Sequence, residues 1–327
     1  MAIPVTVTVG ALVTADDDGV STTQSAAGAQ YLVLNGAKTN GGTANNICQS
    51  QSPGGAGALT LNGTLVASGV AYLGTTPRRI YITSAGNDSG RTFTVVGTGI
   101  NPGIGGQFGI TETITGANTS VVSSTNLFYS ISSITISGAS AAAVTVGANG
   151  VATLDTARRV IVTSGGDDRN ITFTFVGTDT TNTQITEVVT GANATAATTA
   201  LCYKTVTSIL TSGAVATTLI VGTNGVADSP WVRFDQYASN AQTSIVTTVT
   251  GTVNYDIELS NDDPNLPGLT YYQNAAGMAW IDSLDTAVVG ATASKASFFT
   301  YTPVWARVHL NSGTGSVRAT FDQAFYG

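Results

Sequence analysis

Apolar and polar residues alternate with a period of two in short runs along most of the chain. Clear examples are residues 79–83, 110–114 and 131–136. Clusters of Gly, Asn or Asp separate these runs, and no window shows a sustained 3.6-residue period of helix formers. This pattern is typical of short antiparallel strands that are joined by tight turns. The chain is therefore predicted to be all-β.

One stretch of this pattern occurs twice. Residues 78–88, RRIYITSAGND, return 80 positions later as residues 158–168, RRVIVTSGGDD. After a five-residue difference the correspondence continues to residues 146–150 and 221–225. A fixed internal period marks copies of one folding unit. Each copy is predicted to be a small β-sandwich of about five strands.

The repeats predict four segments. Residues 1–68 are an N-terminal arm with short strands at residues 5–9, 31–34 and 59–61. Its polar run from Lys38 to Gly57 has too little apolar material for a core of its own, so we expect this run to be flexible or to lie across a neighbour. Residues 69–150 and 151–225 are the two copies. Residues 226–327 form a C-terminal β-sandwich that resembles a jelly roll.

Within the C-terminal segment, the apolar alternation from Ile245 to Leu259 predicts one long strand or a hairpin about Gly251. Two further strands begin with the same Trp-x-Arg sequence, at Trp231 and at Trp305. These features predict that the C-terminal domain is built differently from the repeats.

The composition adds a constraint on the surface. Only 9% of the residues are charged, against about 25% in an ordinary soluble domain, and the mean hydropathy is +0.21. A surface made mainly of Thr, Ser, Asn, Gly and Ala is weakly protected against association. We therefore expect copies of the chain or another protein to cover much of it, and we expect a homo-oligomer, with a trimer as the working assumption.

The charge balance limits the classes of partner that the protein is expected to bind. The net charge is −7 and the pI is about 4.5, whereas nucleic acids and anionic membranes bind basic surfaces. The arginine pairs at residues 78–79 and 158–159 lie in predicted strands, so one arginine of each pair is expected to face outward. No apolar stretch is long enough to span a membrane, and residues 1–7 show no signal peptide. We expect neither nucleic acid nor membrane as a partner.

Candidate catalytic residues are few. His309 is the only histidine, which argues against a histidine-based triad or a zinc cluster. It lies beside Arg307 on a predicted strand and is interpreted as a structural or surface residue. Glu112 and Glu187 occupy equivalent repeat positions, so a role in the fold of each copy is favoured over glycoside cleavage. We predict no catalytic residue, metal or cofactor.

Cysteine and aspartate positions leave two questions open. Cys48 and Cys202 are interpreted as inert thiols, although a pairing between them is open. The aspartates at residues 16–18, 167–168 and 262–263 are interpreted as turn residues, with a calcium loop as the alternative.

Aromatic residues concentrate in the C-terminal domain, which contains all three tryptophans. Large aromatics are typical of cores and subunit interfaces, and a sugar-binding face is the alternative. The candidate interface or binding residues are Trp231, Arg233, Tyr271, Tyr272, Trp280, Trp305 and Arg307.

Several of these segments together resemble structural proteins of tailed bacteriophages, over about residues 69–327. The matching segments are residues 82–94, 113–118, 221–225, 231–233, 251–255, 306–308 and 313–317. The resemblance implies a component of the virion, assembled in the cytoplasm of the host bacterium. It transfers no catalytic residue.

These observations favour a non-enzymatic capsid decoration or cement protein that covers and bridges capsomers, with the major capsid protein or other virion proteins as its partners. The first alternative is a tail or tail-fibre component whose C-terminal domain binds a glycan of the host. The second alternative is a carbohydrate depolymerase that uses Asp and Glu side chains.

Overall fold

The computed structural model describes most of the chain. The described residues are 4–10, 16–26, 28–35, 39–40, 43–74, 77–100, 108–235, 242–262, 278–299 and 301–324. They form antiparallel β-sheets and one 3₁₀ turn, Thr286–Val288. Within these ranges no helix is long and apolar enough to cross a membrane. The prediction of an all-β fold is confirmed.

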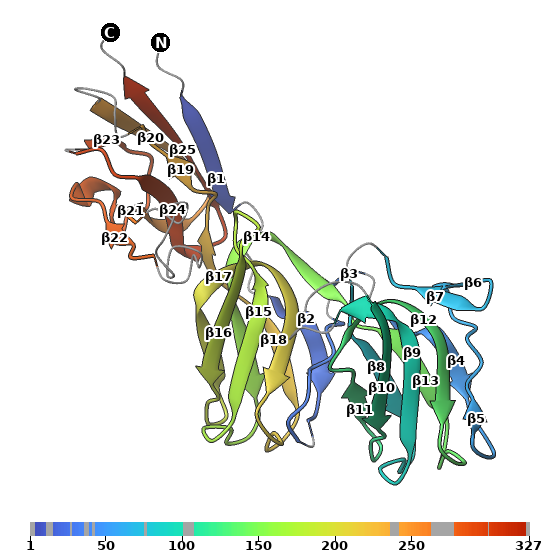
Figure 1. Ribbon diagram of the computed structural model, residues 1–327. Coiled ribbons are helices and arrows are strands. Elements are labelled where there is room, and N and C mark those ends of the chain that lie inside the picture. Colours follow the sequence, from blue (N-terminus) through green and yellow to red (C-terminus); the bar gives the residue numbers. More distant parts are fainter. Residues whose placement is uncertain are drawn as a thin grey trace.

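The first unit encloses its core between two sheets (Figure 1). One sheet has the order β10 (Phe108–Thr115), β9 (Thr92–Ile100), β12 (Leu127–Ile136), β7 (Val70–Tyr72) and β6 (Val66–Ala67), with β5 (Gly57–Ala58) on β12. The other has the order β11 (Val121–Ser123), β8 (Ile80–Ser84), β13 (Val144–Ala148) and β4 (Thr43–Gln51). Phe93 and Phe128, both fully buried, pack in this core.

The second unit repeats this arrangement with longer strands. Its order is β16 (Gln184–Thr190), β15 (Thr172–Thr178), β17 (Ala196–Thr211), β14 (Val151–Ser164) and β18 (Leu219–Asp228), with β2 (Asp16–Gln24) on β18 and β3 (Thr39–Asn40) on β14. Strand β17 corresponds to β11 and β12 joined end to end, since its first residues pair with β14 and its last with β15. The core of this unit contains Phe173, Phe175 and Tyr203.

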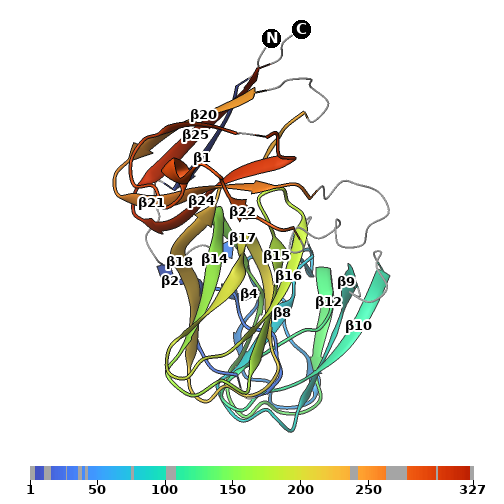
Figure 2. The ribbon, with the colours of Figure 1, turned by 90° about the vertical axis from the view of Figure 1, so that its left-hand side faces the viewer.

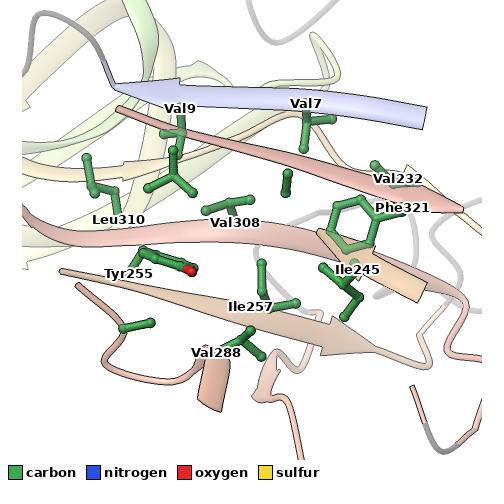
Figure 3. Close-up of a cluster of buried hydrophobic side chains, with 14 of the residues drawn as sticks. Val7, Val9, Val232, Ile245, Tyr255, Ile257, Val288, Val308, Leu310 and Phe321 are labelled. Carbon is green, nitrogen blue, oxygen red and sulfur yellow. The ribbon is translucent and has the colours of Figure 1, made fainter. Parts of the chain in front are cut away.

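The C-terminal unit is also built from two groups of strands. One sheet has the order β1 (Val5–Gly10), β25 (Ser316–Ala324), β20 (Gln242–Thr250) and β23 (Ala296–Phe299). Facing it, β24 (Trp305–Gly313) pairs with β21 (Val253–Ser260) and β19 (Val232–Arg233), and β22 (Ile281–Asp282) pairs with β21. Figure 3 shows the buried side chains between the two layers, among them Val9, Tyr255, Val308 and Phe321.

The segment around Gly251 differs from both sequence expectations. Strands β20 and β21 flank Gly251, but β20 pairs with β25 and β23 whereas β21 pairs with β24 and β22. The chain therefore crosses from one layer to the other at a corner, and it forms neither one long strand nor a hairpin. Gly251 has a φ of +79°, and a Cβ on the adjacent Gly315 would lie 2.2 Å from the carbonyl oxygen of Thr250. Gly315 lies at a second corner, where the chain crosses back between β24 and β25. Glycine is needed at both positions because the two corners are in contact.

The first 68 residues do not form a separate arm. Strand β1 pairs with β25 of the C-terminal unit, β2 with β18 of the second unit and β4 with β13 of the first unit. Val9, Val20 and Ile47 are buried in the corresponding three cores. The segment has no core of its own among the described residues. Instead its strands complete the cores of the C-terminal, second and first units, in that order along the chain. It begins beside the C-terminal end of the chain (Figure 2).

Equivalent carboxylates hold equivalent turns in the two repeats. The side chains of Glu112 and Glu187 each accept hydrogen bonds of 2.6 and 3.0 Å from two successive backbone amides, 13 and 14 residues further on. Asp88 and Asp168 each accept a bond of 2.7 Å from a backbone amide of the turn that precedes the last repeat strand. These acids have matched structural partners in both copies.

This duplication predicts that equivalent substitutions in the two copies lower the stability of the protein by similar amounts. Replacement of Glu112 or Glu187 by Gln places an amide NH₂ group against a backbone N–H, so each change should lower the free energy of unfolding by about 1–3 kcal/mol. Chemical denaturation of the single variants should give similar losses. A loss confined to one copy would contradict the equivalent roles.

The position of β1 in the C-terminal unit predicts that substitutions on its buried face destabilise that unit. Val9→Asp buries an unpaired charge in the C-terminal core and should cost about 3–5 kcal/mol of stability. Thr8→Asp is the matched control, since Thr8 is exposed on the same strand opposite Arg318. Thermal unfolding, with hydrogen exchange of residues 316–324, measures both variants. Equal behaviour of the two would show that β1 does not contribute to this core.

Candidate functional site

A cavity of about 230 Å³ lies where the second unit meets the C-terminal unit. Strands β14, β17 and β18 and the turn before β16 supply one side, and β21, β24 and the segments around Trp231 and Trp280 supply the other. Its charged and aromatic wall residues are Arg159, Asp179, Asp228, Trp231, Glu258, Trp280, Arg307 and His309.

The three tryptophans form one cluster beside this cavity. The ring centroids of Trp231 and Trp280 are 5.2 Å apart, and those of Trp231 and Trp305 are 6.1 Å apart. The guanidinium carbon of Arg307 lies 4.2 Å from the ring centroid of Trp280, and that of Arg233 lies 5.5 Å from that of Trp305. Both distances suit cation–π contacts.

Strand register explains why the Trp-x-Arg segments meet. Strand β19 pairs with β24 so that Arg233 lies opposite Trp305. Five of the seven candidate residues from the sequence therefore lie in one place. The other two, Tyr271 and Tyr272, lie outside the described residues.

A buried network of charges forms one wall of the cavity. Arg307 donates to Asp228 Oδ2 at 2.7 Å and to Glu258 Oε2 at 2.6 Å. His309 Nδ1 lies 2.6 Å from Asp228 Oδ1. Register again provides the contacts, because Glu258 pairs with Arg307 and Asp228 pairs with His309 across neighbouring strands.

This network changes the pKa of its members. Burial alone would raise the pKa of Asp228, but Arg307 and His309 lower it below its usual value. Burial alone would lower the pKa of His309, but its hydrogen bond to Asp228 and the negative charges of Asp228 and Glu258 raise it above 6.5. With His309 protonated, two cations face two carboxylates.

Three members of the network have the donor types of a metal site. Ligand atoms of Asp228, Glu258 and His309 lie within 4.8 Å of one another. The guanidinium of Arg307 already binds both carboxylates, so a cation would have to displace it and break two charge-assisted hydrogen bonds. The arrangement therefore favours a network of ion pairs at the contact between the second and C-terminal units over a metal centre. The sequence showed Arg307 and His309 on one face of a strand, but not that Asp228 and Glu258 are their partners.

The two cysteines are free and buried. Cys48 packs in the core of the first unit, where burial raises the pKa of its thiol to about 12. Cys202 lines the cavity, and burial together with the charge of Asp228 raises its pKa well above the usual value. Both are therefore weak nucleophiles, as expected for inert thiols.

A second cavity, of about 490 Å³, lies between the first and second units. Arg79 lines it, with its guanidinium carbon 3.4 Å from the ring centroid of Tyr31. Arg79 Nη1 also donates to the carbonyl oxygens of Ser124, at 3.1 Å, and Thr125.

The arginine pairs differ from expectation. One arginine of each pair was expected to face solvent. Arg79 and Arg158 are buried, and Arg78 and Arg159 are half-buried. The reason is that each pair lies at a junction between units, where a neighbouring unit covers the outer face.

The chain matches no protein-family model, no curated protein and no solved structure.

The network predicts a pH dependence of stability. Because the folded-state pKa of His309 is raised, its contribution is fully present below pH 6.5 and is lost as the pH rises through the folded-state value. Denaturation between pH 5.5 and 8.5 should show the decline, and His309→Gln should remove it. Since the chain has one histidine, a flat profile would contradict the assignment.

Proposed function

We propose that this protein is a non-enzymatic structural component of a bacteriophage virion, and that it acts as a capsid decoration or cement protein. In this function, many copies cover the shell and bridge capsomers. The major capsid protein or other virion proteins are the partners, and the copies associate as a homo-oligomer.

The observation that carries the proposal is where the charges lie. Few residues are charged, and several of those are enclosed by the fold. Buried charged residues are Arg79, Asp88, Arg158, Asp168, Asp179 and Asp228. The outer surface therefore carries only part of this small number of charges, which suits a surface that becomes covered on assembly.

Exposed apolar side chains support a contact through the C-terminal unit. This unit carries most of the large exposed hydrophobic residues among the described ones, including Val246, Ile281, Leu284 and Phe298. Leu284 and Phe298 line one shallow depression, and they are 67% and 62% exposed. Exposed apolar residues that lie together are typical of protein contact sites.

The continuity of the three units supports a bridging role. The N-terminal segment forms strand pairs with every unit. Separating the units therefore requires breaking backbone hydrogen bonds as well as side-chain contacts. A protein that bridges capsomers needs such continuity.

The tryptophan-lined cavity favours a second candidate. A tail or tail-fibre component with a glycan-binding C-terminal region would also be an all-β virion protein with half-buried tryptophans beside a cavity. The two candidates differ in their location on the particle.

Immunogold labelling of purified virions tests this proposal. An antibody raised against the full chain should label the head surface, at a density comparable with that of an antibody against the major capsid protein. Label confined to the tail would overturn the decoration role and support the second candidate. Absence of label from the particle, with the chain also absent from virions by mass spectrometry, would exclude both.

A further inference from the structure

One sheet of the C-terminal unit ends in a strand with an open edge. The order of this sheet is β1, β25, β20 and β23, so β23 has a partner strand on one side only among the described residues. Figure 1 shows β23 at the outer side of the C-terminal unit. The free backbone groups of an edge strand are a template for pairing with another strand. The residues at this edge determine which strand it can accept.

The backbone of β23 presents two of its residues to the open side. The amide of Thr247 in β20 donates to the carbonyl oxygen of Lys295 at 2.8 Å. Successive residues of an antiparallel strand turn their backbone groups to opposite sides. Lys295 and Ser297 therefore face β20, whereas Ala296 and Phe298 face the open edge. Together these two residues offer two N–H donors and two C=O acceptors there.

Apolar side chains accompany these backbone groups. Phe298 is 62% exposed, and Val246, which lies opposite Ala296 in the neighbouring strand, is 52% exposed. Leu284 and Phe298 line a shallow depression beside the edge. Soluble proteins commonly protect an open edge with charged side chains. An exposed phenylalanine at this position instead indicates an edge that another chain covers.

The charges beside the edge are self-complementary. Lys295 is exposed just before β23. Asp285 lies at the same edge, because its Oδ2 accepts a hydrogen bond of 2.6 Å from Ser297 Oγ. Neither Lys295 nor Asp285 forms an ion pair with a described residue. A two-fold axis at this edge brings the lysine of each copy toward the aspartate of the other, which favours a second copy over an unrelated partner.

We propose that the open edge of β23 binds the same edge of a second copy of the chain, and that the two strands pair antiparallel about a two-fold axis at Ser297. Ala296 of each copy then lies opposite Phe298 of the other, and four backbone hydrogen bonds join the strands. Opposite residues place their side chains on the same face of a sheet. Each phenyl ring therefore covers the small alanine of the other copy and reaches Val246 behind it.

The register follows from the shortness of β23. It pairs both open residues, Ala296 and Phe298, with residues of the second β23, whereas a shift by two residues leaves one of them without a partner from that strand. Pairing of β23 with β1, at the other end of the sheet, would generate rings or filaments instead of a closed dimer. Strand β1 also presents the polar Thr6 and Thr8 as its exposed side chains.

This inference rests on the homo-oligomer of the proposed function, and it adds a contact and a two-fold symmetry in place of the trimer assumed from the sequence. Strand β23 has four residues, so the contact is small, and small interfaces are typical of transient association. Many copies held close together on a shell strengthen a weak contact, because their effective concentration is high. The contact would thus link neighbouring copies after they bind the shell.

Sedimentation velocity of the full-length protein at roughly micromolar to millimolar concentration tests the association. The unchanged protein should pass from monomer to dimer. Phe298→Lys places a charge at the paired edge and should weaken the dimer by about tenfold or more. Val188→Lys is the matched control, because Val188 is 61% exposed on β16, the edge strand of the second unit; its dissociation constant should be unchanged. Thermal unfolding verifies that both variants are folded.

Disulfide trapping tests the register. Position 297 lies opposite itself across the two-fold axis, so Ser297→Cys should give a covalent dimer under mild oxidation. Ala296→Cys is the control from the same strand, since position 296 lies opposite Phe298 of the other copy, and it should give little covalent dimer. Cys48 and Cys202 are buried, so they should not compete for the linkage.

The inference is overturned if the protein remains monomeric over the whole range, if it forms a trimer or a filament, or if Phe298→Lys associates as well as the unchanged protein. Preferential linkage through Ala296→Cys also overturns it. A trimer that is insensitive to Phe298→Lys would remove this contact and retain the homo-oligomer of the proposed function. None of these outcomes alters the immunogold result, so the location of the protein and the contact between its copies are tested separately.

Discussion

The structure depends on the pairing of the N-terminal segment with all three units. An unpaired strand edge is a site for association with other chains, and β13, β18 and β25 would each expose one without β4, β2 and β1. The apolar residues Val9, Val20 and Ile47 enter the cores at the same points. One segment therefore closes edges and fills cores simultaneously. Its first strand, β1, also pairs with β25, the last strand of the described residues.

Comparing the two repeats shows which side-chain contacts are the same in both copies and which differ. The carboxylates of Glu112 and Glu187 have the same backbone partners in both copies, because without an acceptor the amides of each turn would be left unpaired. The junction arginines have diverged, because their surroundings come from whichever unit follows. Arg79 stacks on Tyr31 and donates to backbone carbonyl oxygens, whereas Arg159 lines the cavity beside the tryptophans of the C-terminal unit.

Alternation and turn residues were sufficient to predict the all-β class, because they are local signals. The sequence showed two Trp-x-Arg segments but not their contact, which comes from the antiparallel pairing of β19 with β24 that places Arg233 opposite Trp305. The role of the first 68 residues was not predictable. Val7 and Val9 alternate visibly, but their partner strand lies at residues 316–324, and nothing local identifies it. Gly251 shows the same limit, because a glycine at a positive φ suits a hairpin and a corner equally.

Buried ion pairs connect the second unit to the C-terminal unit, although the chain has few charged residues. Asp228 ends the last strand of the second unit, whereas Glu258, Arg307 and His309 belong to the C-terminal unit. Removing these groups from water costs about as much as their attraction returns, so such a network contributes more to a specific arrangement than to stability. Here the pairing of β18 with β24 and of β21 with β24 brings these groups together. The backbone pairing and the buried ion pairs thus act at the same place, where the second unit and the C-terminal unit form the walls of one cavity.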